Sequence, residues 1–143
     1  MSLDGRYDDQ NIFAKILRGE APAVKVREDE HTLAIMDVFP QAPGHVLVIP
    51  KEPARNLFEL SEEAAEKSIL AVKTVAAAVR RGLEPDGVFV AQFNGAPAGQ
   101  TVFHIHFHII PRTEGDQIAG HGNAKMADMA DLEALADKIR AAL

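Results

Sequence analysis

The sequence predicts one α+β domain built around an antiparallel sheet. Three stretches with the apolar content of strands, residues 24–28, 32–37 and 45–49, follow one another through short connections, which favours an antiparallel meander. Segments with helical periodicity are set apart from these strands and do not strictly alternate with them, so a doubly wound parallel sheet is disfavoured. The length of 143 residues matches a single domain, 1–143.

A short helix is predicted near the start of the chain, after a polar lead-in over residues 1–9 that we expect to be loose. Asn11 is a candidate N-cap for residues 11–18, and Gly19 is a candidate stop signal. Helical spacing places three apolar side chains on one face: Ile12, Phe13 and Ile16.

A long helix is predicted over residues 61–81, with Ser61 as its cap and Gly82 as its end. Its predicted apolar stripe consists of Ala65, Ile69, Val72, Ala76 and Val79. A last amphipathic helix is predicted over about 129–142, after an exposed loop over residues 113–127.

Two further strands, residues 88–93 and 102–110, complete a set of five. In the second, three histidines alternate with large apolar residues. Because side chains alternate faces along a strand, the three imidazoles share one face and the apolar residues point into the core. The histidines are His104, His106 and His108, and the core residues are Ile105, Phe107 and Ile109.

The turn before these histidines has the residue types that an anionic ligand needs. Gly99 allows the backbone to approach a ligand closely, and Gln100 and Thr101 add an amide and a hydroxyl. A neutral imidazole is a good nucleophile near pH 7, provided that its other nitrogen keeps a proton. Flanking imidazoles and amides then stabilise charge on phosphoryl oxygens, so the segment favours chemistry at phosphorus.

The histidines have two other interpretations. Alternating histidines on a strand can present zinc ligands, with His45 or His121 added, but no acidic or Cys ligand lies nearby in the sequence. Neighbouring Cβ atoms on one strand face are also roughly 6–7 Å apart. A polar face without function is the other reading. His31 and His121 fall in predicted loops, where we expect them to be solvated, and we expect no metal and no cofactor.

The composition limits the classes of partner. The net charge is −6 and no basic run is present, so a nucleic-acid partner is not expected. The chain has no Cys, no apolar run near the ~18 residues that span a bilayer and no secretory signal, so we expect a cytoplasmic protein without a membrane partner.

Three segments resemble the signatures of a known family. His104-Ile-His-Phe-His-Ile-Ile resembles the histidine-triad (HIT) motif. The stretches 11–16 and 37–50 resemble the opening helix and the next signature of the nucleotide-binding branch of that family. The resemblance covers a core of about 10–112, which leaves the remainder as a C-terminal extension.

The resemblance implies a fold and a mechanism. It implies a five-stranded antiparallel sheet with two main helices, and a two-fold homodimer with a continuous ten-stranded sheet. His106 would be the nucleophile that forms a nucleotidyl-enzyme intermediate, His108 would donate to the α-phosphate, and His104 would support the site. Gln100 is included among the expected catalytic residues.

The resemblance also implies a nucleotide pocket. Thr101 and the Gly99 backbone would hold phosphate oxygens, Asp37 would bind the ribose hydroxyls, and His45 would lie near the triad. The base would be walled by Ile12, Phe13, Ile16, Ile35 and Val38. Each residue also has a structural reading: Asp37 as a turn residue, the apolar side chains and His45 as core, and Gln100 and Thr101 as turn formers.

Two positions depart from the family pattern. Some relatives carry two Cys near the opening helix that join a zinc site, whereas this chain has Gln10-Asn-Ile-Phe-Ala14, so structural zinc is not expected. Several relatives place an Asn or Gln seven residues before the position of Gln100, where this chain has Phe93. The next residue, Asn94, is the candidate replacement.

The function predicted first is hydrolysis at the α-phosphate of a purine nucleotide derivative, with adenosine 5′-phosphoramidate converted to AMP. The second is dinucleoside polyphosphate hydrolysis, because residues 98–102 and Pro111-Arg112 resemble that branch, where Arg112 could meet a distal phosphate. The third is a nucleotide-binding regulator whose weak hydrolysis is incidental.

Overall fold

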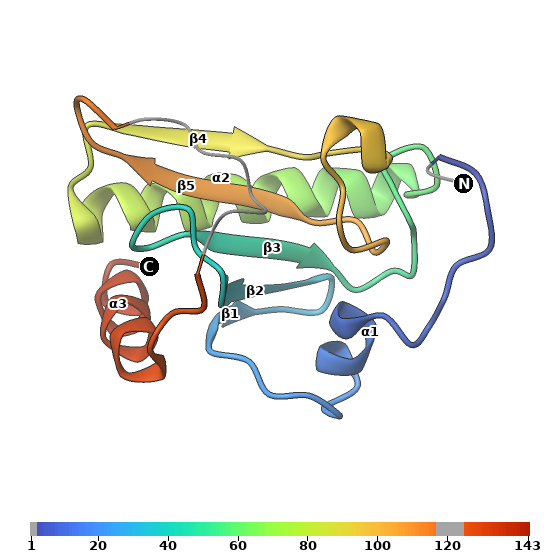
Figure 1. The fold of residues 1–143 in the computed structure, drawn as a ribbon, viewed down its shortest axis with the longest axis horizontal. Helices are drawn as coiled ribbons and strands as arrows, with labels where there is room; N and C mark the ends of the chain where they lie inside the picture. The colour runs from blue at the N-terminus through green and yellow to red at the C-terminus, as the bar shows by residue number, and fades with distance from the viewer. Residues whose placement is uncertain (1–2, 117–124) are drawn as a thin grey trace.

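The computed structural model describes residues 3–116 and 125–143, so His121 lies outside the described residues. Its five strands form one sheet in the order β1-β2-β3-β5-β4, and every neighbouring pair is antiparallel (Figure 1). The strands are β1 (Lys25–Glu28), β2 (Thr32–Met36), β3 (Val46–Pro50), β4 (Gly87–Ala91) and β5 (Phe107–Arg112). The predicted α+β class and the antiparallel meander β1-β2-β3 are confirmed.

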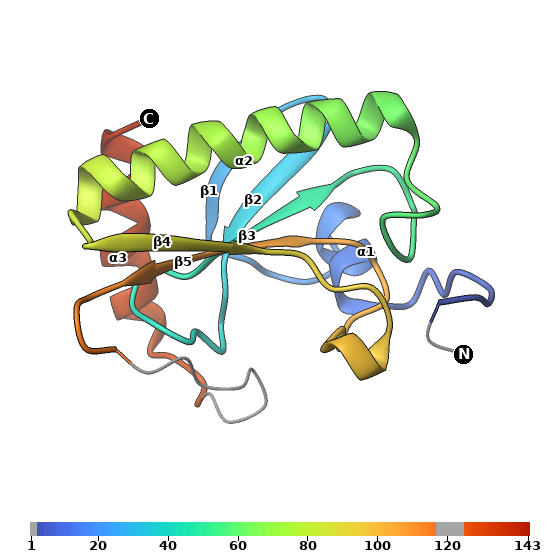
Figure 2. The same cartoon turned by 90° about the horizontal axis from the view of Figure 1, so that it is seen from above.

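Helices cover the two faces of the sheet differently. The long helix α2 (Glu62–Leu83) crosses one face, and the short helix α1 (Ile12–Leu17) lies on the other side (Figure 2). Strand side chains alternate between two buried clusters, one with α2 and one with α1. In β2, for example, Met36 joins the α2 cluster and Ile35 joins the α1 cluster. This burial on both faces explains the nearly continuous apolar sequence of β2 and β3.

Helix α2 begins as predicted, because the Ser61 hydroxyl accepts a hydrogen bond from the Ala64 amide at 3.1 Å. Its end is corrected. The helix continues through Gly82, and Glu84 terminates it in the left-handed conformation with φ 53°. A Cβ at residue 82 would lie 2.7 Å from the carbonyl oxygen of Lys138, so this glycine permits close helix packing and is no stop signal.

The predicted apolar stripe of α2 was also partly wrong. Ile69 is 54% exposed, and Ala65 and Ala76 are only partly buried. The helix carries so many alanines and valines that its sequence fits two overlapping stripes. The residues that the structure buries are Ala64, Ser68, Ala71, Val72, Val75, Ala78 and Val79.

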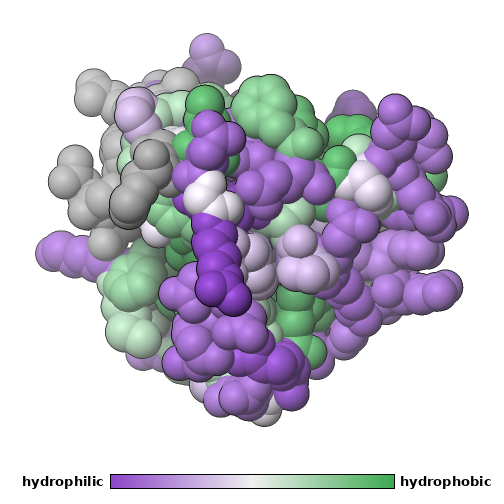
Figure 3. Space-filling view, turned by 90° about the vertical axis from the view of Figure 1, so that its right-hand side faces the viewer, coloured by the Kyte–Doolittle hydropathy of each residue, from purple (hydrophilic) through white to green (hydrophobic). Residues whose placement is uncertain are grey.

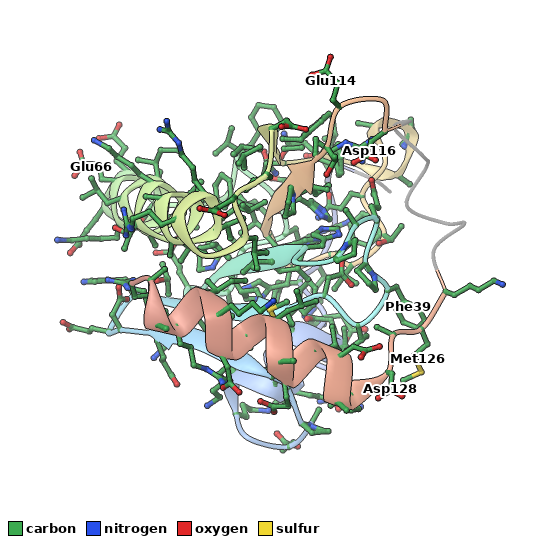
Figure 4. The ribbon with its side chains drawn as sticks, turned by 90° about the vertical axis from the view of Figure 1, so that its left-hand side faces the viewer. Phe39, Glu66, Glu114, Asp116, Met126 and Asp128 are labelled. Carbon is green, nitrogen blue, oxygen red and sulfur yellow. The ribbon has the colours of Figure 1, made fainter. Side chains whose placement is uncertain are left out.

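The last helix, α3 (Met129–Ala141), lies where it was predicted and packs against α2 and β1. The Arg140 guanidinium donates to the Lys25 carbonyl, and the amide of Ala127 donates to the carbonyl of Val38 at 2.9 Å. Figure 4 shows Phe39, Met126 and Asp128 close to one another at the start of this helix. The C-terminal segment therefore borders the turn that follows Asp37.

The strand predicted over residues 102–110 starts later in the structure, at Phe107. Residues 101–106 are irregular, and the Ile105 amide donates to the carbonyl of Ala54 at 2.9 Å. His104 and His106 therefore precede the strand, and the prediction that all three histidines share a regular strand face was wrong. Within the described part of the chain, no helix is long and apolar enough to cross a lipid bilayer.

Candidate active site

The three histidines nevertheless come together. All three side chains are buried, and the ring centroids of His106 and His108 lie 4.9 Å apart. The ring of Phe13, from α1, makes edge contacts with His106 at 4.7 Å and with His104 at 6.5 Å between centroids. As predicted, Ile105 and Ile109 point into the core.

A main-chain acceptor determines the protonation of His106. Its Nδ1 lies 2.8 Å from the carbonyl oxygen of His104. A carbonyl can only accept, so Nδ1 carries the proton and Nε2 carries the lone pair in the neutral ring. The chemistry at phosphorus inferred from the sequence needs this tautomer, because the lone pair on Nε2 makes that nitrogen the nucleophilic one.

A second chain of hydrogen bonds determines the protonation of His108. The Gln41 amide donates to Nδ1 of His45 at 3.0 Å, so the proton of neutral His45 is on Nε2. That Nε2 lies 3.0 Å from Nδ1 of His108 and 3.4 Å from Oδ2 of Asp37. Donation from His45 to Nδ1 leaves His108 with its own proton on Nε2, where it can donate to a phosphoryl oxygen.

His104 is hydrogen-bonded at both ring nitrogens. Its Nε2 donates to the carbonyl of Pro50 at 2.7 Å, and its Nδ1 lies 2.6 Å from the hydroxyl of Tyr7. Burial lowers the pKa of His104, which keeps this imidazole uncharged beside His106. Nothing in the sequence predicts a role for Tyr7, which lies in the polar lead-in over residues 1–9.

Asp37 is buried at the end of β2 and has two structural neighbours. One carboxylate oxygen accepts from the Phe39 amide at 2.8 Å, which is the turn role that the sequence also allows for this residue. The other faces His45. His45 itself is fully buried and joins Asp37 to the triad, so both are placed at the site.

The loop before the triad is held by Gln100. Its amide nitrogen donates to the carbonyls of Arg55 at 2.6 Å and Val102 at 3.0 Å, and its amide oxygen accepts from the Gly95 amide at 2.8 Å. These bonds favour the turn-forming reading of Gln100 over direct contact with a phosphate. In the same loop, Gly99 has φ 107°, a conformation that favours glycine.

Asn94 does not face the histidines. Its side-chain oxygen accepts from the Leu57 amide at 2.9 Å and from the Gln92 amide group at 2.8 Å. The ring of Phe93 lies instead beside His108, with 5.1 Å between centroids. The prediction that Asn94 supplies the site amide is therefore corrected: an aromatic ring occupies that place.

The predicted base wall divides into two groups. Phe13, Ile16 and Ile35 belong to the buried α1 cluster, whereas Ile12 is 47% exposed and Val38 is half-buried. Ile12 also lines a cavity of about 620 Å³ with Thr101, between the N-terminal segment, α1 and loop 96–103. Figure 3 shows this end of the molecule, which is mostly hydrophilic with hydrophobic side chains between the polar ones.

Among the described residues, one group brings three possible metal ligands together. Single ligand atoms of Asp37, His45 and His108 lie within 4.8 Å of one another, and all three side chains are buried. The 3.0 Å separation of the two imidazole nitrogens is the length of an N–H···N hydrogen bond. A cation at this place would have to displace the proton that determines the His108 tautomer. His31, by contrast, lies partly exposed in the β1–β2 turn.

The fold and the site define a small α+β protein with a cluster of buried, hydrogen-bonded imidazoles at one end of an antiparallel sheet. The HIT domain model matches residues 18–115. The chain belongs to the HIT family.

Comparisons with known proteins agree with this assignment. Protein hit of Bacillus subtilis is 48% identical over 101 residues, which are 71% of this chain and 70% of that protein. Adenosine 5′-monophosphoramidase hnt1 of Schizosaccharomyces pombe is 42% identical over 111 residues, 78% of this chain and 80% of that one. The crystal structure of a Hit-like protein involved in cell-cycle regulation from Bartonella henselae, with an unknown ligand, superimposes with a TM-score of 0.92 at 49% identity, covering 97% of this chain and all of that one.

Proposed function

We propose that this protein hydrolyses the α-phosphate linkage of a purine nucleotide derivative, in the simplest case adenosine 5′-phosphoramidate to AMP. The observation that carries the proposal is the 2.8 Å hydrogen bond from Nδ1 of His106 to the His104 carbonyl, because it makes Nε2 the nucleophilic nitrogen. The phosphoramidase hnt1, a relative at 42% identity, supports the choice of substrate.

In the proposed reaction, Nε2 of His106 attacks the α-phosphorus. The P–N bond of the substrate breaks, its electron pair stays on the departing nitrogen, and that nitrogen takes up a proton from the solvent. His108 donates its Nε2–H to a phosphoryl oxygen as charge accumulates there. Water then attacks the nucleotidyl–imidazole and gives one proton back to the solvent, which releases AMP and restores neutral His106.

The remaining roles are assigned by place. Asp37 is proposed to contact the ribose hydroxyls. Thr101 and the Gly99 backbone are proposed to contact the phosphate oxygens. Ile12 and Val38 are proposed to flank the base, with Phe13 holding the rings of His104 and His106 from behind. Gln100 is proposed to shape the phosphate loop through its three backbone hydrogen bonds.

The proposal is tested with adenosine 5′-phosphoramidate. The wild-type protein should release AMP, and mass spectrometry of the enzyme quenched during turnover should find an AMP adduct on His106. His106→Ala should lose turnover and adduct, yet still be stabilised against heat by AMP. Near wild-type turnover by His106→Ala would rule out the covalent mechanism.

Arg112 favours a second candidate, dinucleoside polyphosphate hydrolysis. It follows His108 by four residues on the same face of β5, about 13 Å along the strand. One guanidinium nitrogen of this half-buried side chain is buried without a hydrogen-bond partner, and the residue opposite on β4 is Gly87, which has no side chain to fill the space. A distal phosphate would satisfy that nitrogen.

The two substrates are separated by a side-by-side assay of adenosine 5′-phosphoramidate and diadenosine polyphosphates. If the second candidate is correct, Arg112→Gln should lower kcat/KM for the polyphosphate and leave the phosphoramidate reaction unchanged. If the protein turns over neither compound, yet AMP raises its melting temperature, the nucleotide-binding regulator is the better description.

A further inference from the structure

The N-terminal segment, residues 3–9, is attached to the rest of the domain although it precedes the residues that the HIT domain model matches. Asn56 donates from its side-chain nitrogen to the Leu3 carbonyl at 2.9 Å. At the other end of the segment, Arg18 donates to the Asp9 carbonyl at 2.7 Å. These contacts hold the segment across the end of the sheet where the triad lies (Figure 1).

Tyr7 is the residue of this segment that reaches the triad. Its hydroxyl lies 2.6 Å from Nδ1 of His104, and its ring meets that imidazole edge-on with 5.7 Å between centroids. The direction of the bond is settled, because Nε2 of His104 already donates to the Pro50 carbonyl and Nδ1 must accept. Burial raises the pKa of Tyr7, so the phenol keeps the proton that it donates.

His104 passes this constraint to His106 through its own main chain. The carbonyl of His104 is the acceptor for Nδ1 of His106 at 2.8 Å. Residues 101–106 have no strand neighbours to hold them, so the side chain of His104 is one of the anchors of this carbonyl. Its two anchoring bonds end on the Pro50 carbonyl and the Tyr7 hydroxyl.

We propose that Tyr7 is a positioning residue for the nucleophile: its hydroxyl locks the tautomer and the place of His104, and thereby keeps the His104 carbonyl aimed at Nδ1 of His106. The proposal rests on the proposed function of His106. Without the hydroxyl, the buried Nδ1 of His104 loses its donor, and the ring can change its tautomer or turn. The carbonyl then moves relative to His106, and the alignment of the attacking nitrogen is lost.

Tyr7→Phe tests the proposal, because it removes one oxygen atom and keeps the ring. With adenosine 5′-phosphoramidate we expect kcat to fall roughly tenfold and KM to stay within about twofold, since geometry at the reacting atom is lost and nucleotide contacts are kept. Leu3→Ala is the matched control from the same segment. It keeps the backbone carbonyl that Asn56 contacts, and it should leave kcat unchanged.

A spectroscopic measurement tests the same bond without substrate. In protein labelled with ¹⁵N-histidine, Tyr7→Phe should move the Nδ1 resonance of His104, downfield where Nδ1 only loses its donor and far upfield where the tautomer changes. It should also perturb the resonances of His106. If Tyr7→Phe keeps the wild-type kcat, or leaves the His106 resonances unmoved, the positioning role is overturned. An inactive wild-type protein in which Tyr7→Phe shifts both histidines would overturn the proposed function and support the coupling of Tyr7 to His106.

Discussion

At the scale of single residues, the site is a set of imidazoles whose tautomers are chosen by their neighbours. The Gln41 amide, the His104 carbonyl and the Tyr7 hydroxyl each meet one ring nitrogen, and each leaves the other nitrogen of that ring with a defined role. The histidines could be picked out from their alternation in the sequence. Their partners could not, because main-chain groups have no residue-type signature and Tyr7 is separated from His104 by 97 positions.

His45 gives a prediction at this scale. His45→Ala removes the donor to Nδ1 of His108, so the proton of His108 is free to move between its two nitrogens and the phosphate loses an assured donor. We expect kcat for adenosine 5′-phosphoramidate to fall about 10- to 100-fold, by analogy with metal sites that lose the partner orienting an imidazole ligand. Steady-state kinetics and a melting curve check it; a loss of activity explained by unfolding alone would contradict the prediction.

Phe93 gives a second prediction at the scale of single residues. Its ring lies beside His108, with 5.1 Å between the two ring centroids. Phe93→Asn should change the dependence of the hydrolysis rate on the departing amine more than it changes the affinity for AMP. The reason is that the site gains a hydrogen-bond donor and loses an apolar contact. Rates for phosphoramidates with small and aromatic amines should show the change. Equal changes in both rates and in AMP binding would argue for general loosening of the site.

At the scale of secondary-structure elements, the existence and type of all eight predicted helices and strands could be read from the sequence, whereas boundaries set by tertiary contacts could not. The end of α2 and the burial of its faces depend on α3, which packs against it from 46 positions later in the sequence, counted from Leu83 to Met129. The start of β5 depends on Ala54, whose carbonyl takes the amide of Ile105 out of the sheet.

Gly82 provides a test of helix packing. In an open helix position, Gly→Ala stabilises by up to about 1 kcal/mol. Here the new Cβ would lie 2.7 Å from the Lys138 carbonyl, so Gly82→Ala should instead destabilise the fold by about 1–3 kcal/mol. Urea denaturation measures the change. Gly87→Ala, whose new Cβ would meet nothing within 4 Å, is the control and should stay within about 0.5 kcal/mol of wild type.

The β1–β2 turn gives a prediction about pH. Burial raises the pKa of Asp29, but hydrogen bonds from the His31 and Thr32 amides and from Arg27 outweigh it and lower this pKa to about 2. A lowered carboxyl pKa stabilises the fold above the ordinary value of 3.8, and that contribution is lost as the pH falls through about 2. Asp29→Ala should therefore melt earlier than wild type at pH 7, and the gap should narrow between pH 4 and 2. A constant gap would contradict the ionic origin.

At the scale of the whole molecule, the two edges of the sheet differ in what they expose. Strand β4 ends the sheet on one side and shows apolar side chains to solvent, with Phe89 38% and Val90 46% exposed. Strand β1 ends the other side with mostly charged residues. An apolar edge with unpaired backbone groups is a template for further strand pairing, which fits the dimer that the family resemblance implies.

We therefore expect the protein to be a dimer that pairs β4 with β4. Light scattering coupled to gel filtration should give twice the mass of the chain, and Val90→Lys should shift the protein toward the monomer because a charge interrupts the apolar edge. Glu28→Gln makes the same change in net charge on the opposite edge and should leave the mass unchanged. A Val90→Lys protein that remains fully dimeric would place the interface elsewhere.

The irregular backbone of residues 101–106 has a consequence for how such a nucleophile can arise. In a regular ladder, the oxygen of residue 104 would be committed to a neighbouring chain segment, and the imidazole two positions later would find no proton acceptor there. Because β5 begins only at Phe107, the oxygen of residue 104 is free of the ladder and accepts a hydrogen bond from the His106 side chain. A substitution that extended β5 backward to residue 104 would therefore lengthen the sheet and remove the acceptor that holds the proton on Nδ1 of His106.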